Sequence, residues 1–133
     1  MYSQTMTVDD AHIDFQDVVD GLYYPFYMET VRHAFMKEVA GVDLQQDAAE
    51  GKFHMLLEYT IKFKKSLQRG DTFVVTCVPG FHEKKNRVVF NQKIIKDGAV
   101  YAEADFVATC LINGRPAIPD SFSAVIEAAQ SEA

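Results

Sequence analysis

One stretch of helical periodicity, between residues 24 and 39, limits most strongly the folds open to this chain of 133 residues. Its apolar side chains recur at intervals of three and four residues, namely at Tyr24, Tyr27, Met28, Val31, Phe35 and Val39. This spacing forms one apolar stripe along an α-helix and is not the spacing of a strand. Pro25 suits the first helical turn and Gly41 suits a C-terminal stop, so we predict a helix from Pro25 to Ala40.

The opposite face of this predicted helix carries Glu29, Arg32, His33 and Lys37. Residues three and four apart on a helix are neighbours, so we expect these side chains to meet water and one another, with Glu29 as a surface partner of Arg32 or His33. At the amino end, no Ser, Thr, Asp or Asn stands directly before the first turn to accept hydrogen bonds from its amide groups. Those donors are therefore available to something other than a capping side chain.

Four segments with strand patterning follow the helix, at residues 56–65, 72–78, 87–95 and 100–112. In the first segment apolar and polar residues alternate, which is typical of a strand with one buried face. Asp97-Gly98, between the last two segments, is a strong hairpin signal because both central residues of such a turn must tolerate positive φ.

The remaining segments are less regular. Residues 6–15 alternate loosely and predict an edge strand, the polar stretch 42–52 predicts a loop or an irregular turn, and a short helix is predicted from about Asp120. The order of one strand, one long helix and four strands joined by short turns predicts an α+β fold whose antiparallel sheet wraps the helix. The length suits one core, so we expect residues 1–133 to form a single domain.

The last predicted strand is mostly apolar on both faces of its second half. Alternation places Phe106, Ala108, Cys110 and Ile112 on one face, and Val107, Thr109 and Leu111 on the other. A sheet covered by one helix needs only one apolar face. The second face therefore favours a partner chain, and we predict a homodimer.

The charge of the chain argues against two classes of partner. Its formal net charge is -6, whereas nucleic acid and anionic membranes both attract a positive protein surface. No apolar run approaches the roughly 20 residues of a membrane-spanning helix. The first residues, MYSQTMTVDD, have neither the basic flank nor the apolar stretch of a secretory signal. We therefore expect a cytoplasmic protein that binds neither nucleic acid nor membrane.

Cys77 and Cys110 lie in strand-like segments, without the spacing of a metal site and without a histidine close in sequence. We expect both thiols to be reduced and buried, acting as small apolar side chains, and we expect no bound metal.

The order of elements is that of hotdog-fold proteins, and residues 17–27 allow a closer comparison. This stretch resembles the 4-hydroxybenzoyl-CoA thioesterase-like acyl-CoA thioesterases, in which an aspartate precedes a short loop, a Tyr or Asn, and an aromatic residue on the helix. Without a gap, these correspond to Asp17, the loop 18–23, Tyr24-Pro25 and Tyr27. A looser likeness extends over residues 59–71 and the later strands, so the resemblance covers most of the chain in order and spacing.

This resemblance implies hydrolysis of an acyl thioester at a site shared between subunits. In the family, the aspartate that matches Asp17 acts as nucleophile or general base. A backbone N–H at the start of the central helix, here that of Tyr24, holds the thioester carbonyl. This agrees with the uncapped helix front, because amide donors at the positive end of a helix stabilise a developing oxyanion. Coenzyme A enters as part of the substrate and no separate cofactor is expected; the choice between a dimer and a tetramer built as a dimer of dimers stays open.

Two residues depart from the family pattern. Asp20 stands where the family commonly has Gly or His, which makes it a second candidate for the catalytic role. Phe26 stands where Asn is frequent, and it makes the entrance of the site more apolar. Tyr23 and Phe26 lie off the helical stripe and, together with Tyr27, are our candidates for lining an acyl pocket.

The phosphates of coenzyme A require a basic patch on this acidic protein. In relatives a basic pair near the start of the corresponding strand contacts the nucleotide phosphates. The pair falls here on Lys84 and Lys85, with Arg87 in place of the usual small residue. A solvent-exposed hairpin tip explains these three basic residues equally well. Lys64 with Lys65 is the second candidate pair for binding the phosphates.

Two other functions fit the same fold. A non-catalytic module that binds acyl groups or coenzyme A would explain the altered loop around Asp20. A hotdog dehydratase is a weaker alternative, because no histidine stands in a segment where that chemistry would need one. The four histidines, His12, His33, His54 and His82, are scattered along the chain, and we assign none of them a catalytic role.

Overall fold

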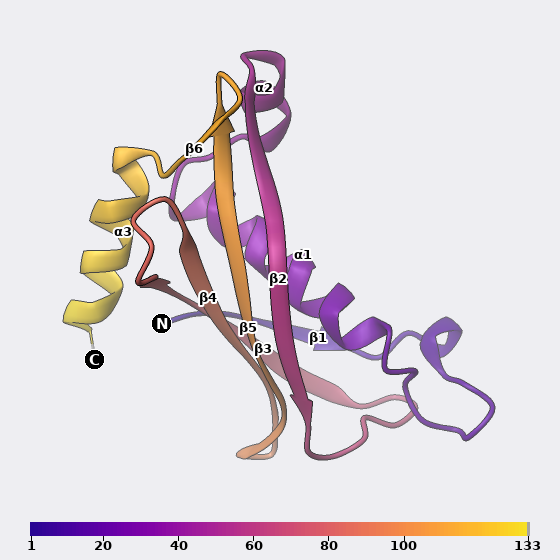
Figure 1. The fold of residues 1–133 in the computed structure, drawn as a ribbon. Coiled ribbons are helices and arrows are strands. Elements are labelled where there is room, and N and C mark those ends of the chain that lie inside the picture. Colours follow the sequence, from indigo (N-terminus) through magenta and orange to yellow (C-terminus); the bar gives the residue numbers. More distant parts are fainter. Residues whose placement is uncertain (133) are drawn as a thin grey trace.

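The computed structural model describes residues 1–132 and contains an antiparallel sheet curled around a long helix (Figure 1). Its elements follow in the order β1 (Tyr2–Thr7), η1 (Asp10–His12), α1 (Tyr23–Glu38), α2 (Leu44–Ala49), β2 (Lys52–Phe63), β3 (Thr72–Phe81), β4 (Val88–Lys96), β5 (Ala99–Ile112), β6 (Arg115–Ala117) and α3 (Asp120–Ser131).

The strands form one sheet in the order β1-β3-β4-β5-β2, with β6 paired to β5, and every pairing is antiparallel. The edge strand β2 pairs with β5 from Lys52 to Phe63. Asp97 and Gly98 have φ values of 50° and 76° and join β4 to β5, so the predicted hairpin is confirmed. The predicted α+β fold, with an antiparallel sheet around one long helix, is also confirmed.

Helix α1 begins at Tyr23, two residues before the predicted start, and ends at Glu38. Gly41 has a φ of 68° beyond the helix, as expected of a glycine that ends a helix. The predicted stripe is buried except at Val39, which is 48% exposed because it lies just past the last helical turn. The buried residues that were predicted are Tyr24, Tyr27, Met28, Val31 and Phe35.

The prediction that Arg32 faces water is wrong. This side chain is 5% exposed, and its guanidinium lies 4.3 Å from the centroid of the Phe106 ring. Its Nη1 donates to Gln92 Oε1 at 3.0 Å. The predicted surface pair between Glu29 and His33 is confirmed, with 3.7 Å between the carboxylate oxygen and Nε2. The buried face of α1 is therefore wider than the apolar stripe, because the sheet curls around the helix.

Three short segments differ from their predictions. The first strand covers Tyr2–Thr7 and not residues 6–15, because the Asp9 side chain caps a single 3-10 turn, η1, directly after it. The predicted loop 42–52 contains α2, where the Asp43 side chain accepts a hydrogen bond from Gln46 N. The three-residue strand β6 was not predicted. It is held by pairing with the end of β5, which no local pattern reveals.

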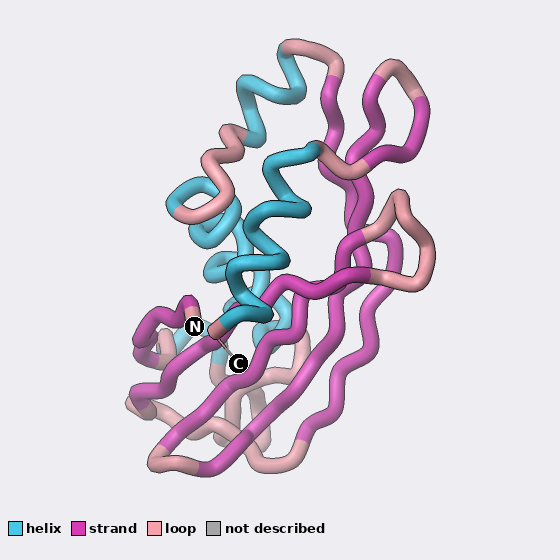
Figure 2. Tube along the Cα trace, turned by 90° about the vertical axis from the view of Figure 1, so that its left-hand side faces the viewer, coloured by secondary structure: helices cyan, strands magenta, loops and turns pink. Residues whose placement is uncertain are grey.

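The predicted C-terminal helix is confirmed as α3, which packs against β3 and adds Phe122 and Ile126 to the core. Figures 1 and 2 both place the two chain ends close together, and the Met1 amino group lies 3.1 Å from the Glu132 carboxylate. Among residues 1–132, no helix combines the length and the apolar character needed to cross a membrane.

Candidate active site

The front of α1 is less open than the sequence suggests, because Asp20 occupies two amide groups there. The Asp20 carboxylate accepts a hydrogen bond from Leu22 N at 2.9 Å, and the Asp20 carbonyl accepts one from Tyr23 N at 3.0 Å. Leu22, directly before α1, makes no side-chain cap, and Pro25 has no N–H to offer. The helix is thus uncapped at Leu22 as expected, but a carboxylate two residues earlier takes over part of that role.

Tyr24 N makes a longer hydrogen bond than Leu22 N or Tyr23 N at the front of α1. Its bond to the Gly21 carbonyl is 3.4 Å long, compared with 3.0 Å for the bond of Tyr23 N. A donor–acceptor separation of 3.4 Å makes a weak hydrogen bond. An incoming carbonyl oxygen can therefore replace the Gly21 carbonyl as the acceptor of the Tyr24 N–H at little cost.

Asp17 lies in the loop before α1 with a left-handed backbone, at a φ of 65°. Its carboxylate is 80% exposed and lies 3.3 Å from Arg69 Nη2, while Arg69 Nη1 lies 3.3 Å from Asp10. Asp20 instead accepts hydrogen bonds at the start of the helix, from Leu22 N with its carboxylate and from Tyr23 N with its carbonyl. The two predicted acids therefore share a loop but have different partners.

A third carboxylate of this loop, Asp14, was not singled out from the sequence. It is half-buried, and its side chain accepts a hydrogen bond from Gln16 N at 2.8 Å. Burial raises the pKa of the Tyr24 hydroxyl, and the charges of Asp71 and Asp14 add to this effect. Asp14 is thus a further carboxylate in the loop before α1. No sequence signal distinguishes it from the other loop acids, since only its placement in space does so.

The aromatic residues predicted for the site include buried core side chains and side chains that are more exposed. Tyr24 is 3% exposed and belongs to the core, and Tyr27 is also buried. Burial raises the pKa of Tyr27 to about 12, and its hydroxyl lies 2.7 Å from His12 Nδ1. Tyr23 stacks on the His12 ring at 3.9 Å, and Phe26 is 48% exposed. The structure thus gathers Tyr23, Phe26 and Tyr27 around His12, a residue to which we gave no role from the sequence.

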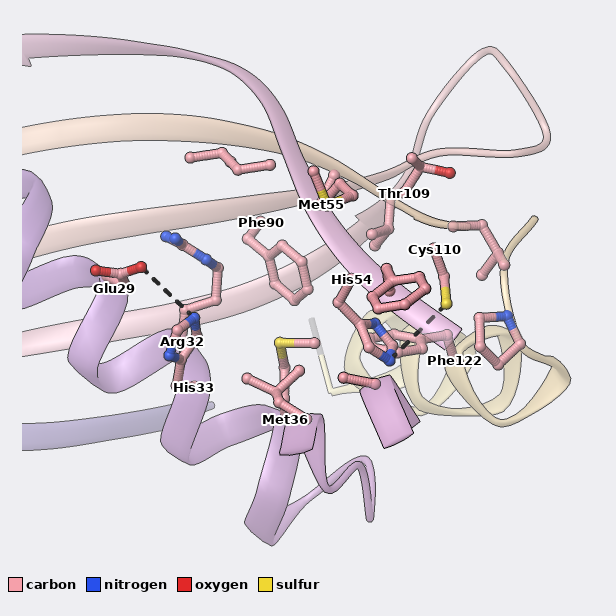
Figure 3. A pocket seen from close by; sticks show the side chains of 18 residues that line it. Glu29, Arg32, His33, Met36, His54, Met55, Phe90, Thr109, Cys110 and Phe122 are labelled. Carbon is pink, nitrogen blue, oxygen red and sulfur yellow. Dashed lines mark hydrogen bonds and ion pairs between the residues drawn. The ribbon is translucent and has the colours of Figure 1, made fainter. Parts of the chain in front are cut away.

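An apolar cavity of about 310 Å³ lies between α1, α2, strands β2, β4 and β5, and the start of α3 (Figure 3). Figure 3 shows Glu29, Arg32 and His33 at one end and His54 and Cys110 at the other, with apolar side chains between them. This volume falls in the range of small-molecule sites, about 300 to 1,000 Å³. The sequence did not reveal this cavity, because its walls come from six separate elements.

At the second end of the cavity, His54 Nε2 lies 2.8 Å from Asp47 Oδ2 and 3.9 Å from Cys110 Sγ. Burial raises the pKa of the Cys110 thiol, and the Asp47 charge adds to this effect. The thiol therefore stays protonated near neutral pH and is a poor nucleophile. Both cysteines are free and buried, as predicted. In residues 1–132, no three potential ligands form a group that could hold a metal ion.

The basic residues predicted to bind phosphate lie in the loop between β3 and β4. Lys84 and Lys85 are exposed and Arg87 is half-buried. The loop adjoins the cavity, because Thr109 Oγ1, on the cavity wall, donates to the Asn86 carbonyl at 2.6 Å. In Figure 1 this loop lies beside α3, across the molecule from the front of α1. One chain by itself therefore does not bring these cations to Tyr24 N.

Comparison with protein-family models defines the class of this protein. Residues 8–126 match the model of the thioesterase-like superfamily, and this range is most of the chain. The protein therefore belongs to the thioesterase-like superfamily. A search of curated proteins gives no significant match.

Solved structures with the same fold include thioesterases that act on coenzyme A esters. Slr0204, a 1,4-dihydroxy-2-naphthoyl-CoA thioesterase from Synechocystis, is 17% identical with a TM-score of 0.85, and the match covers 94% of each chain. SAV2348 from Staphylococcus aureus, solved in complex with CoA, is 20% identical with a TM-score of 0.84 over 97% of this chain and 83% of that one. A DHNA-CoA thioesterase from Staphylococcus aureus is 16% identical with a TM-score of 0.82 over 98% and 93% of the two chains. These matches confirm the predicted hotdog fold.

Proposed function

We propose that this protein is an acyl-CoA thioesterase that hydrolyses an acyl thioester to a free acid and coenzyme A. Membership of the thioesterase-like superfamily supports the reaction class. The observation that carries the proposal is the front of α1, where Tyr24 N makes only a 3.4 Å bond and lies behind a loop that carries carboxylates. A preorganised backbone donor of this kind typically lowers the barrier of acyl transfer by about 2.7 to 4 kcal/mol.

In the proposed reaction, Asp17 supplies the carboxylate and Asp20 is the second candidate. The carboxylate either takes a proton from the attacking water or attacks the carbonyl itself, giving an anhydride that water then opens. Tyr24 N holds the carbonyl oxygen as negative charge develops on it, and the CoA thiolate leaves. Because a thiolate is a good leaving group, no histidine partner is required.

The proposed substrate contacts follow from the same geometry. Tyr23 and Phe26, with Tyr27 behind them, flank the helix front on the side of the acyl group. Lys84 and Lys85, together with Arg87, bind the phosphates. Lys64 is less suited to that role, because it already lies 3.8 Å from the Glu103 carboxylate.

We infer that the active protein is a homodimer, with a tetramer as a dimer of dimers left open. Within one chain the loop between β3 and β4 lies across the molecule from the start of α1 (Figure 1), so we infer that a CoA ester contacts both in two different chains. The edge strand β2 supports this assembly, because it exposes Phe53, Met55, Leu56, Leu57, Tyr59 and Phe63 by 44% to 54%. A long apolar edge strand is a surface that another strand covers. We also propose that this enzyme acts in the cytoplasm.

The test is hydrolysis of a panel of aliphatic and aromatic acyl-CoA esters by the purified protein and by single carboxylate variants. Asp17→Asn is a suitable variant because Asn also tolerates the positive φ at this position. We expect it to reduce kcat at least about a hundredfold, the usual scale for loss of a positioned base, with unchanged far-UV circular dichroism. An equal loss in Asp20→Asn or Asp14→Asn alone, with Asp17→Asn active, would move the assignment to that residue.

A second candidate function is a non-catalytic acyl or CoA binding module. The hydrogen bond from Leu22 N to the Asp20 carboxylate favours it, as does the pairing of Asp17 with Arg69, because both carboxylates already have partners. Calorimetric binding of CoA with no hydrolysis of any ester in the panel would establish this alternative.

A further inference from the structure

Arg32 is a buried cation on the wall of the cavity, and it has no acidic partner. The residue is 5% exposed. Across residues 1–132, its one hydrogen bond runs from Nη1 to Gln92 Oε1, and no carboxylate lies within 4.0 Å of the guanidinium. Every fully buried polar side-chain atom in this part of the chain has a hydrogen-bond partner. The other N–H groups of Arg32 must therefore reach open space, and the space beside them is the cavity.

The position of this guanidinium is fixed by its surroundings. Gln92 is fully buried, and its Nε2 donates to the carbonyls of Met28 at 2.8 Å and Thr76 at 3.3 Å. These two bonds turn Gln92 Oε1 toward Arg32, which donates to it. The guanidinium also lies over the ring of Phe106, with Cζ 4.3 Å from the ring centroid. The charge is therefore held in place before any ligand arrives.

A buried charge without a counter-ion is unfavourable, because it has lost its water and gained little in return. Burial lowers the pKa of Arg32, and the nearby Cys77 and Glu29 offset this only in part. A planar guanidinium with unused donors matches a carboxylate, which accepts two parallel hydrogen bonds from it. The apolar walls of the same cavity match a hydrocarbon chain or ring.

We propose that the cavity binds acyl groups that end in a carboxylate, and that Arg32 selects them by pairing with that distal carboxylate. The preferred substrates would then be mono-thioesters of dicarboxylic acids. This inference rests on the proposed thioesterase function for the thioester end of the ligand, but the pairing with Arg32 is a binding property that can be measured without hydrolysis.

Other ionisable groups near Arg32 affect how strongly the cavity attracts the carboxylate of a ligand. Glu29 and His33 line the same end of the cavity and pair with each other at 3.7 Å, and the exposed Glu29 carboxylate repels an incoming anion. Cys77 is buried in the core, and burial raises the pKa of its thiol to about 12, so it brings no negative charge near neutral pH. The hydrogen bond between His54 and Asp47 lies at the far end of the cavity, where Figure 3 labels His54. Among the described residues that line the cavity, Arg32 is thus the permanently charged cation beside which a ligand carboxylate can bind.

The test uses thioether analogues of CoA that cannot be hydrolysed. Calorimetry compares S-(5-carboxypentyl)-CoA with S-hexyl-CoA, which has the same number of carbons and no carboxylate. We expect the wild-type protein to bind the carboxylated analogue about tenfold more tightly, the effect of a charge-assisted pair. Arg32→Met should remove this preference, so that the two analogues bind with similar affinity. Glu29→Gln, an exposed substitution, should increase the preference.

A second neutral variant guards against loss of folding. Arg32→Gln keeps a donor for Gln92 and removes the charge, so it should lose the preference as Arg32→Met does. A preference that survives in either folded variant, or a wild-type protein that binds both analogues equally, would overturn the proposal. If neither analogue binds but hexanoate binds to the wild type and not to Arg32→Gln, the CoA function fails and the role of Arg32 stands.

Discussion

At the scale of single residues, burial controls the chemistry of the two cysteines. Cys77 is 1% exposed, and burial raises the pKa of its thiol to about 12 from an ordinary value of 9.0. The folded protein therefore keeps this proton at a pH where the unfolded chain releases it. It follows that the Cys77 thiol stabilises the fold fully below pH 9, and that this contribution is lost as the pH rises toward 12.

We predict that Cys77→Ala flattens the fall in the free energy of unfolding between about pH 9 and pH 12, the window set by the two pKa values. Urea unfolding at a series of pH values measures this slope. In Cys77→Ala the lost packing of the thiol lowers the free energy of unfolding at every pH. Only the slope of this free energy against pH therefore reports the titration of the thiol. Parallel curves for the variant and the wild type would contradict the prediction.

At the scale of elements, the amino end of α1 depends on the loop before it. The Asp20 carboxylate bonds to Leu22 N at 2.9 Å, next to the positive end of the helix. We predict that Asp20→Ala lowers the free energy of unfolding by about 1 kcal/mol, the usual effect of losing a capping side chain. Chemical denaturation followed by circular dichroism measures this change.

The matched control for this helix prediction is Asp20→Asn, which keeps an oxygen acceptor for Leu22 N. It should lose much less stability than Asp20→Ala. If the two variants are equally unstable, the hydrogen bond to Leu22 is not what supports the helix start. Because Asp20 is also a candidate for the catalytic role, the same pair of variants separates a structural effect from a chemical one.

At the scale of the whole molecule, the apolar surface lies on β2 and not on β5. We predicted a partner chain from the two apolar faces of residues 106–112, but Val107 is 8% and Thr109 is 5% exposed within one chain. The loop before β4 covers this face, since Thr109 bonds to the Asn86 carbonyl. The dimer prediction now rests on the exposed edge of the sheet.

We predict that Leu57→Asp separates the proposed dimer into monomers, because it places a charge on the exposed apolar edge, where Leu57 is 45% exposed. Size-exclusion chromatography with light scattering measures the mass. Val39→Asp is the control, since Val39 is 48% exposed just beyond the end of α1 and its substitution should leave the mass unchanged. A wild-type protein with the mass of one chain would exclude the proposed assembly.

Local patterns were sufficient for most elements of the fold. The three- and four-residue spacing from Tyr24 to Phe35 predicted α1, and Asp97-Gly98 predicted the hairpin between β4 and β5. Both signals act over a few residues, where backbone sterics and side-chain direction decide the conformation. The helix α2 and the strand β6 were missed because a capping side chain and a pairing with β5 hold them, and neither has a repeating pattern.

The sequence by itself determined the fold class and the family, because periodicity, turn chemistry and the order of elements are all written along the chain. Only the tertiary structure decided which polar residues are buried and which loop acids have partners. Arg32 has the spacing of a surface residue but lies in the core, since the curled sheet encloses more of α1 than its apolar stripe. The cavity beside it arises where six elements meet, and the distances between those elements are set by packing across the whole molecule.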